Sequence, residues 1–260
     1  MSQHDSFIPK RPPGQDELPC DDGEPMETPL HRLQMNVLID SLEDAWKDRP
    51  DFYVGGNMFV YFSQLQIKNN DFRGPDVFVV LDCERKRRKS WVAWEEGGKL
   101  PDVVIELVSE TTAEVDRKEK KRIYERTWRL PEYFIYDPEA TTLEAYRLEP
   151  IQREYVLIQP DEAGDVAVSR LGLKLGVRPS QIHLYEGPLL RWLDGDRPLP
   201  YGSELAQHER QRAQQERQRA EQARQRAERE QQRAGEERER AQRAEARVRE
   251  LEEQLRRSKS

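Results

Sequence analysis

The run DVVIELVS at residues 102–109 constrains the fold more than any other part of the chain. Val103, Val104 and Ile105 are consecutive apolar residues, so an extended segment here would bury both of its faces. This predicts a central strand in a sheet that is covered on both sides. Glu106 interrupts the run, and a carboxylate is almost never fully buried unless it is paired or binds a metal. The rest of the chain must therefore supply a partner for Glu106.

The neighbouring segments predict one α/β domain at residues 28–200, with a mixed central sheet flanked by helices. Thr28 and Pro29 look like an N-cap and a first-turn proline, so the first helix is expected at about 29–47. The segments that follow have the composition of strands at 52–62, 75–82 and 102–109, a helix at 111–128, a strand at 132–137, and a mostly β region to about residue 200. Residues 1–27 are rich in Pro, Asp, Glu and Gly, and we expect a disordered leader there.

Residues 203–260 predict a long, charged helix. Alanine recurs every seven residues from Ala206 to Ala241, and Val248 and Leu255 continue the register. The positions three residues further along are mostly glutamate and become apolar only near the C-terminal end. One interpretation is a coiled coil that pairs two copies of the chain at that end. The other is a solvated helix stabilised by charge pairs three or four residues apart.

Composition narrows the possible partners. The net charge is −7, although residues 204–260 hold 16 Lys/Arg and only 13 Asp/Glu, so the rest of the chain is strongly acidic. An acidic body argues against strong non-specific nucleic-acid binding. No apolar run is long enough to span a membrane, and the N-terminus lacks the apolar core of a signal peptide. With only two cysteines and no disulfide framework, we expect a cytoplasmic protein.

Two acids on or beside predicted strands suggest a metal site. Asp76 begins the strand in GPDVFVV and Glu106 lies within VVIELVS. Carboxylates on neighbouring strands repel each other, and a divalent cation relieves that repulsion. The pattern is compatible with metal-assisted phosphodiester hydrolysis. The structural alternatives are that Asp76 is an exposed turn acid and that Glu106 is buried against an arginine.

The helix after Glu106 offers a cation for such a site. At about 100° per residue, Asp116, Ile123, Tyr124 and Thr127 all fall within about 60° of Lys120. Lys120 therefore centres the face expected to pack on the sheet, and it could extend its ammonium group toward a polar site. A pair between Asp116 and Lys120 with no catalytic role is the alternative.

Five blocks in order resemble the Uma family, which is classed as "putative restriction endonucleases" within the PD-(D/E)xK phosphodiesterase superfamily. The blocks are YVGGNMFVYF, GPDVFVV, LPDVVIELVSETT, DRKEKKRIYE and LPEYFIYDP. The resemblance covers about residues 27–195 and implies a restriction-endonuclease-like core. Asp76 and Glu106 match the two acidic positions of the superfamily motif. The usual lysine two residues after the acid is replaced by Val108, and the family similarly places a lysine four residues before a tyrosine on the next helix, as Lys120 and Tyr124 stand here.

The resemblance implies a divalent-metal-dependent endonuclease that uses Mg²⁺ or Mn²⁺ and leaves 5′-phosphate and 3′-hydroxyl products. Asp76 and Glu106 would hold the metal, and Lys120 would act on the attacking water or the phosphate. The expected substrate is nucleic acid, DNA rather than RNA. Two alternatives remain open: a catalytically silent binding or scaffold protein that works through its C-terminal helix, and a phosphodiesterase for small nucleotides.

Further residues of the chain could contribute to this site. Asp102 and Tyr124 are candidates for supporting contacts behind the metal ligands, although an acid at a strand entry, such as Asp102, is more often a solvated turn residue. His31 could point toward the site, but a lone helix histidine is more often structural, so we do not assign it a role. A basic segment between the two acidic strands could grip a nucleic-acid backbone, with Trp91 and Trp94 available for stacking, or could be a solvated loop. Its cations are Arg85, Lys86, Arg87, Arg88 and Lys89.

Overall fold

The computed structural model describes residues 14, 28–63, 72–108 and 116–258. The predicted leader, apart from Gly14, and the first part of the helix predicted at 111–128 lie outside these residues. Two compact units divide the chain, Met1–Glu204 and Leu205–Ser260. The first unit contains, in chain order, α1 (Pro29–Ala45), β1 (Phe52–Gly55), β2 (Val60–Tyr61), β3 (Phe72–Arg73), β4 (Val77–Leu81), β5 (Trp91–Val92), β6 (Val103–Leu107), η1 (Asp116–Lys120), α3 (Lys121–Ile123), η2 (Tyr124–Trp128), β7 (Glu132–Asp137), β8 (Thr142–Leu148), β9 (Tyr155–Leu157), β10 (Val166–Val168), β11 (Leu173–Ile182), β12 (Tyr185–Asp194) and β13 (Arg197–Pro198).

The central sheet has six strands in the order β1-β4-β6-β7-β8-β9. Its pairs are antiparallel except for β6 and β7, which are parallel and are connected through the helical segments η1, α3 and η2. A second sheet contains β10 to β13, and a small third sheet contains β3, β2 and β5. The predicted α/β class with a mixed central sheet is therefore confirmed. The strand expected at 52–62 is instead two strands, which separate after the glycine pair at Gly55 and Gly56.

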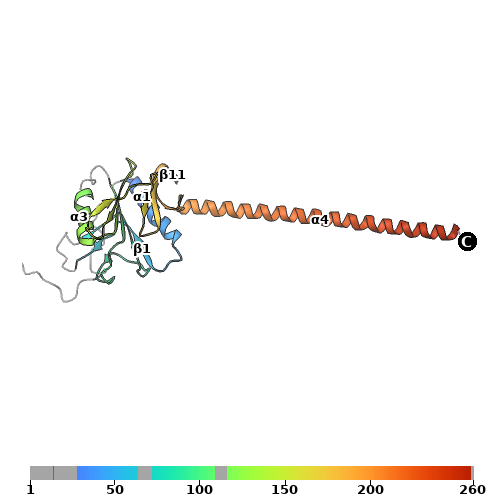
Figure 1. Ribbon diagram of the computed structural model, residues 1–260, viewed down its shortest axis with the longest axis horizontal. Helices are drawn as coiled ribbons and strands as arrows, with labels where there is room; N and C mark the ends of the chain where they lie inside the picture. Colours follow the sequence, from blue (N-terminus) through green and yellow to red (C-terminus); the bar gives the residue numbers. More distant parts are fainter. Residues whose placement is uncertain (1–13, 15–27, 64–71, 109–115, 259–260) are drawn as a thin grey trace, which may run out of the picture. The chain divides into compact units, whose positions relative to one another are not determined.

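The central strands are buried on both faces, as the apolar run predicted. Alternate residues of β4 and β6 point into two different cores: Val79 and Ile105 into one, Phe78 and Val104 into the other. The first core is closed by α1 and the second sheet, and the second by α3 and η2 (Figure 1). This two-sided cover leaves the ends of the strands as the places where polar side chains can meet.

Helix α1 is capped at its start and is fixed to the second sheet at two points. The Thr28 side chain caps its first turn by accepting from the His31 backbone N–H at 3.0 Å. The fully buried Gln34 side chain exchanges two hydrogen bonds, each of 2.9 Å, with the backbone of Leu190 in β12. The Trp192 indole donates to the Leu38 carbonyl at 2.8 Å. The register of α1 against the second sheet is therefore set by specific bonds as well as by apolar packing.

The helix that connects β6 to β7 is mostly a π-helix where it is described. Both η1 and η2 are π-helical, with the short α3 between them. The prediction of a helix is correct. The assumed rotation of about 100° per residue belongs to an α-helix, however, whereas i→i+5 hydrogen bonding widens each turn and so lowers the rotation per residue. Single π-turns are often found at functional sites, where they reorient one side chain.

The long helix α4 (Gly202–Ser258) has its first three residues in the first unit and forms the second unit from Leu205 onward. Residues 210–227 are exposed throughout. Within the first unit, the buried Arg191 guanidinium donates to both carboxylate oxygens of Glu204. In the described part of the chain, none of the helices is long and apolar enough to cross a membrane.

Candidate functional site

Glu106 is fully buried and its carboxylate is bonded at both oxygens. The Tyr124 hydroxyl donates to Oε1 at 2.7 Å, and the Lys120 ammonium lies 3.0 Å from Oε2. Both partners come from the helix that follows β6. The buried glutamate therefore has a cation and a neutral donor as partners, which satisfies the requirement for a buried charge.

Asp76 lies opposite Glu106 on the neighbouring strand. Val77 pairs with Ile105 in the antiparallel register of β4 and β6, so one step outward brings Asp76 opposite Glu106. The backbone N–H of Leu107 donates to Asp76 Oδ2 at 2.8 Å. The two predicted acids thus meet where β4 begins and β6 ends.

A glycine makes room for the backbone of Asp76. A Cβ atom on Gly56 would lie 2.1 Å from the Asp76 carbonyl oxygen, so any side chain there would collide with this backbone. The adjacent Asn57 N–H donates to the Pro75 carbonyl at 3.1 Å. The glycine pair in YVGGN therefore allows the loop after β1 to support the segment that carries Asp76.

His31 is the site residue that the sequence analysis left without a role. Its Nε2 lies 3.0 Å from Asp76 Oδ1, and its side chain is only 12% exposed. The available signal was helical spacing, because His31 precedes the buried Met35 and Leu38 by four and seven residues and so belongs to the face of α1 that packs on the sheet.

The site borders solvent on one side. The side chains of Asp76 and Lys120 are 21% and 23% exposed, whereas Glu106 is inaccessible. A ligand that approaches from solvent would therefore meet Asp76 and the Lys120 ammonium first. Lys121, the adjacent lysine, instead lies over the Tyr146 ring, 3.4 Å from its centroid.

The donor chemistry at this position fits a hard divalent cation. Asp76 and Glu106 provide carboxylate oxygens, and Mg²⁺ typically takes one or two protein carboxylates and completes its coordination with waters and substrate. Within residues 14, 28–63, 72–108 and 116–258, no group of three or more His, Cys, Asp or Glu side chains forms a metal cage. The protein would therefore contribute the two carboxylates and leave most of the coordination to other ligands.

Asp102, one of the two candidates for a supporting contact, lies away from this site. Asp102 precedes β6, at the end opposite Glu106. Its Oδ2 accepts from the Leu81 backbone N–H at 2.8 Å, and its Oδ1 accepts from Arg170 Nε at 3.1 Å. Asp102 closes the far end of the β4–β6 pair. Tyr124, the other supporting candidate, contacts Glu106 directly.

The basic segment also lies at the far end of the sheet. It follows the end of β4, and the five residues of β4, Val77–Leu81, span about 17 Å of extended chain. Arg85 is paired with Glu43 on α1, which is twelve residues, or about 18 Å, along the helix from His31. These cations therefore lie at the opposite end of β4 from Asp76.

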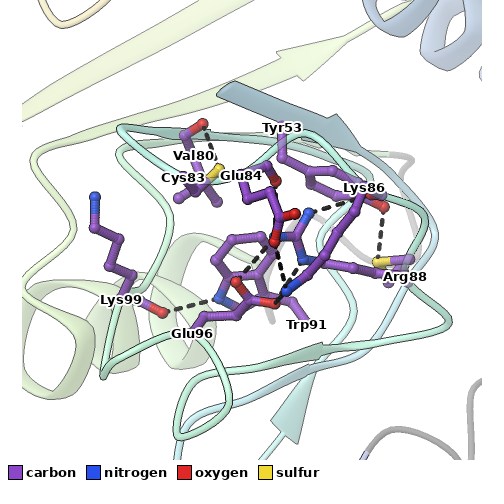
Figure 2. A network of polar contacts seen from close by, with 10 residues as sticks. Tyr53, Val80, Cys83, Glu84, Lys86, Arg88, Trp91, Glu96 and Lys99 are labelled. Carbon is purple, nitrogen blue, oxygen red and sulfur yellow. Dashed lines mark hydrogen bonds and ion pairs between the residues drawn. The ribbon is translucent and has the colours of Figure 1, made fainter. Parts of the chain in front are cut away.

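Arg88, within the basic segment, is buried, and Figure 2 shows the network of polar contacts around it. Arg88 donates from Nε and Nη2 to the two carboxylate oxygens of Glu96 at 2.7 and 2.9 Å. Its guanidinium lies over the rings of both Tyr53 and Trp91, 4.9 and 4.6 Å from their centroids. Trp91 is fully buried and cannot stack on a base.

The remaining members of the segment differ in exposure. Lys86 is paired with Glu84 and Glu96. Arg87 and Lys89 are exposed, so a contact between these two cations and nucleic acid stays a prediction. Trp94, which is partly buried, packs beside Tyr61.

The fold is a mixed α/β sheet covered on both faces, with two acids and a lysine close together at one end of its central strands. A sequence model of the family described as "Uma2: Putative restriction endonuclease" matches residues 13–183. The chain belongs to the Uma2 family, so the predicted family membership is confirmed.

Comparison with individual proteins adds little. One similar solved structure is the crystal structure of "a putative nuclease belonging to DUF820" from Anabaena variabilis ATCC 29413. It is 18% identical, with a TM-score of 0.42, and the match covers 61% of this chain and 90% of that one. No curated protein matches this sequence.

Proposed function

We propose that this protein is a divalent-metal-dependent endonuclease in which Asp76 and Glu106 hold Mg²⁺ or Mn²⁺ and Lys120 assists the reaction. The observation that carries the proposal is the buried Glu106, which lies opposite Asp76 on the neighbouring strand and is paired with a lysine at the solvent boundary. An ion pair that served stability alone could be replaced by apolar residues in such a core, often without loss of stability. Family membership supports the same assignment.

The residues of the chain have separable roles in this proposal. A bound divalent ion would lower the pKa of a coordinated water and neutralise charge on the scissile phosphate. The Tyr124 hydroxyl holds Oε1 of Glu106 and so fixes the orientation of its carboxylate. The Lys120 ammonium, at the solvent boundary, is placed to donate to a phosphate oxygen or to orient the attacking water. The buried strands behind the acids exclude water from the other side.

A cleavage assay with matched variants tests this function. The full chain would be incubated with single- and double-stranded DNA and RNA in Mg²⁺ or Mn²⁺, beside Asp76→Ala, Lys120→Ala and Lys118→Ala. Lys118 is an exposed lysine of the same helix, so its variant should retain activity. Cleavage that survives both the Asp76 and Lys120 substitutions would overturn the site. If no substrate is cleaved and calorimetry detects no metal binding, the scaffold alternative is favoured.

We further propose that DNA is the preferred polymer and that the protein acts in the cytoplasm.

We also propose that α4 pairs with α4 of a second copy near its C-terminal end. Val248, at a seam position of the heptad register, is 54% exposed. Earlier in the helix, Arg212 and Arg217 would face each other across a parallel pair, and this repulsion disfavours pairing there. The apolar seam positions near residue 248 are therefore the part of α4 suited to self-association.

A further inference from the structure

We propose that His31 is a positioning residue that fixes the carboxylate of Asp76 for metal binding. This inference rests on the proposed nuclease function. It assigns a role to the first helix, which the acid–acid–lysine motif does not include. The contact joins residues 45 positions apart in the sequence, at 3.0 Å between His31 Nε2 and Asp76 Oδ1.

The chemistry of the contact fixes its direction. An ionised carboxylate has no proton to donate, so Nε2 of the His31 ring must carry the hydrogen and donate it to Oδ1. On the other side, Oδ2 accepts from the Leu107 backbone N–H at 2.8 Å. One donor on each oxygen prevents rotation of the carboxylate. Because a carboxylate oxygen has two lone-pair directions, each oxygen still has capacity for a cation.

The position of His31 is itself determined by bonds on both sides along α1. The Thr28 side chain caps the helix at the His31 backbone N–H. Three residues later, Gln34 is held by its two hydrogen bonds to Leu190. The imidazole therefore projects from a helix that can neither slide nor rotate without breaking buried hydrogen bonds. A donor held in this way pre-organises the group that it contacts.

The location of α1 makes the contact electrostatically favourable as well. His31 lies in the first turn of a 17-residue helix, whose aligned peptide dipoles give this end a partial positive charge. The Asp76 carboxylate is bonded to this first turn through the His31 ring, so the charge of the helix end attracts it.

Metal binding by the full chain tests the role of His31. The affinity for Mn²⁺ alone would be measured by calorimetry for wild type, His31→Leu, His31→Gln and Asn36→Leu. Loss of an outer hydrogen bond to a metal ligand typically costs about 10- to 100-fold in affinity, and this is the weakening expected for His31→Leu. His31→Gln restores an N–H donor at a similar reach and should recover most of the affinity. Asn36→Leu removes an amide from the same helix away from the site and should bind as wild type does.

A second measurement on the metal-free protein keeps the test independent of activity. Side-chain ¹⁵N NMR of His31 should show a proton on Nε2 with the shift of a hydrogen-bonded group, and that signal should move in Asp76→Leu. A ring protonated only on Nδ1 would overturn the inference even if His31→Leu fails to fold. Wild-type Mn²⁺ affinity in a folded His31→Leu variant would overturn the role of His31 and leave the nuclease assignment standing. If the wild-type chain binds no metal and cleaves no substrate, the proposed function and this inference fail together.

Discussion

The Tyr124 hydroxyl donates a 2.7 Å hydrogen bond to Glu106, and both side chains are fully buried. A tyrosine from the crossover helix therefore holds a strand carboxylate in place from inside the core. The same carboxylate receives Lys120 from the solvent side. Glu106 is oriented by one partner and neutralised by the other, so the two contacts can be tested separately.

Removal of the Tyr124 hydroxyl should destabilise the protein. In Tyr124→Phe one oxygen of a buried carboxylate loses its donor, which costs about 1–3 kcal/mol of unfolding free energy. Chemical denaturation would measure this loss, and the Mn²⁺ affinity should fall with it.

Tyr136→Phe is the matched control for that substitution. Among the described residues, the Tyr136 hydroxyl is buried without a hydrogen-bond partner, and burial raises its pKa to about 12. Removal of this hydroxyl should leave stability unchanged or raise it slightly. An equal loss of stability in both variants would show that the Tyr124–Glu106 bond contributes nothing specific.

Two buried glutamates on adjacent strands should respond oppositely to conversion to glutamine. Glu132 in β7 accepts from Arg147 and from the backbone of Ser169 and Arg170, so it ties three elements together. We expect Glu132→Gln to lose stability and to retain cleavage below its unfolding temperature. Glu106→Gln should keep most of its stability, because an amide oxygen still accepts a hydrogen bond, and should lose cleavage and metal binding. Thermal unfolding and cleavage measured on the same samples would separate the two roles, and equal activity losses would contradict this assignment.

The Arg88–Glu96 pair predicts a pH-dependent contribution to stability. Hydrogen bonds from Arg88 lower the pKa of Glu96 below its usual value of 4.5. The stabilisation is therefore complete above about pH 4.5 and is lost as the pH falls through the lower, folded-state pKa. Glu96→Gln should cost about 3 kcal/mol at pH 7, because the Arg88 side chain is left buried without its counter-charge.

Denaturation at several pH values provides the measurement. The difference between wild type and Glu96→Gln should shrink below about pH 4.5, whereas the exposed neighbour Glu95→Gln should differ little from wild type at any pH. A difference that is constant down to pH 3 would remove Glu96 ionisation as the cause.

Self-association through α4 should depend on the apolar seam near its end. Val248→Glu places a like charge on both helices of a pair and should shift the protein to monomer. Gln242→Glu adds the same charge outside the seam and should leave the association state unchanged. Sedimentation of both variants, beside wild type and a 1–203 truncation, would measure this effect. Equal association states for the full chain and the truncation would exclude pairing through α4.

The local sequence was sufficient for the elements and for part of the site. Apolar runs located β4, β6 and β7, and the cap at Thr28 located the start of α1. The spacing of Lys120 and Tyr124 placed both on the helix face that contacts Glu106, even though the helix there is largely π-helical. A step of four residues returns to nearly the same face of an α-helix and of a π-helix. Lys120 and Tyr124 therefore share a face in both geometries.

The relative direction of neighbouring strands decided where the remaining residues lie. Only the tertiary structure fixes that direction. Side-chain alternation along a strand selects a face, but it does not say which end of the neighbouring strand lies opposite. Because β4 and β6 are antiparallel, Asp76 at the start of one meets Glu106 near the end of the other, while Asp102 and the basic segment lie at the opposite end. His31 joins Asp76 only because α1 packs across the sheet with its N-terminus at the site. The sequence by itself singled out Asp76, Glu106 and Lys120, since burial pattern and spacing are local; the packing of strands and helix decided that these three meet and that His31 joins them.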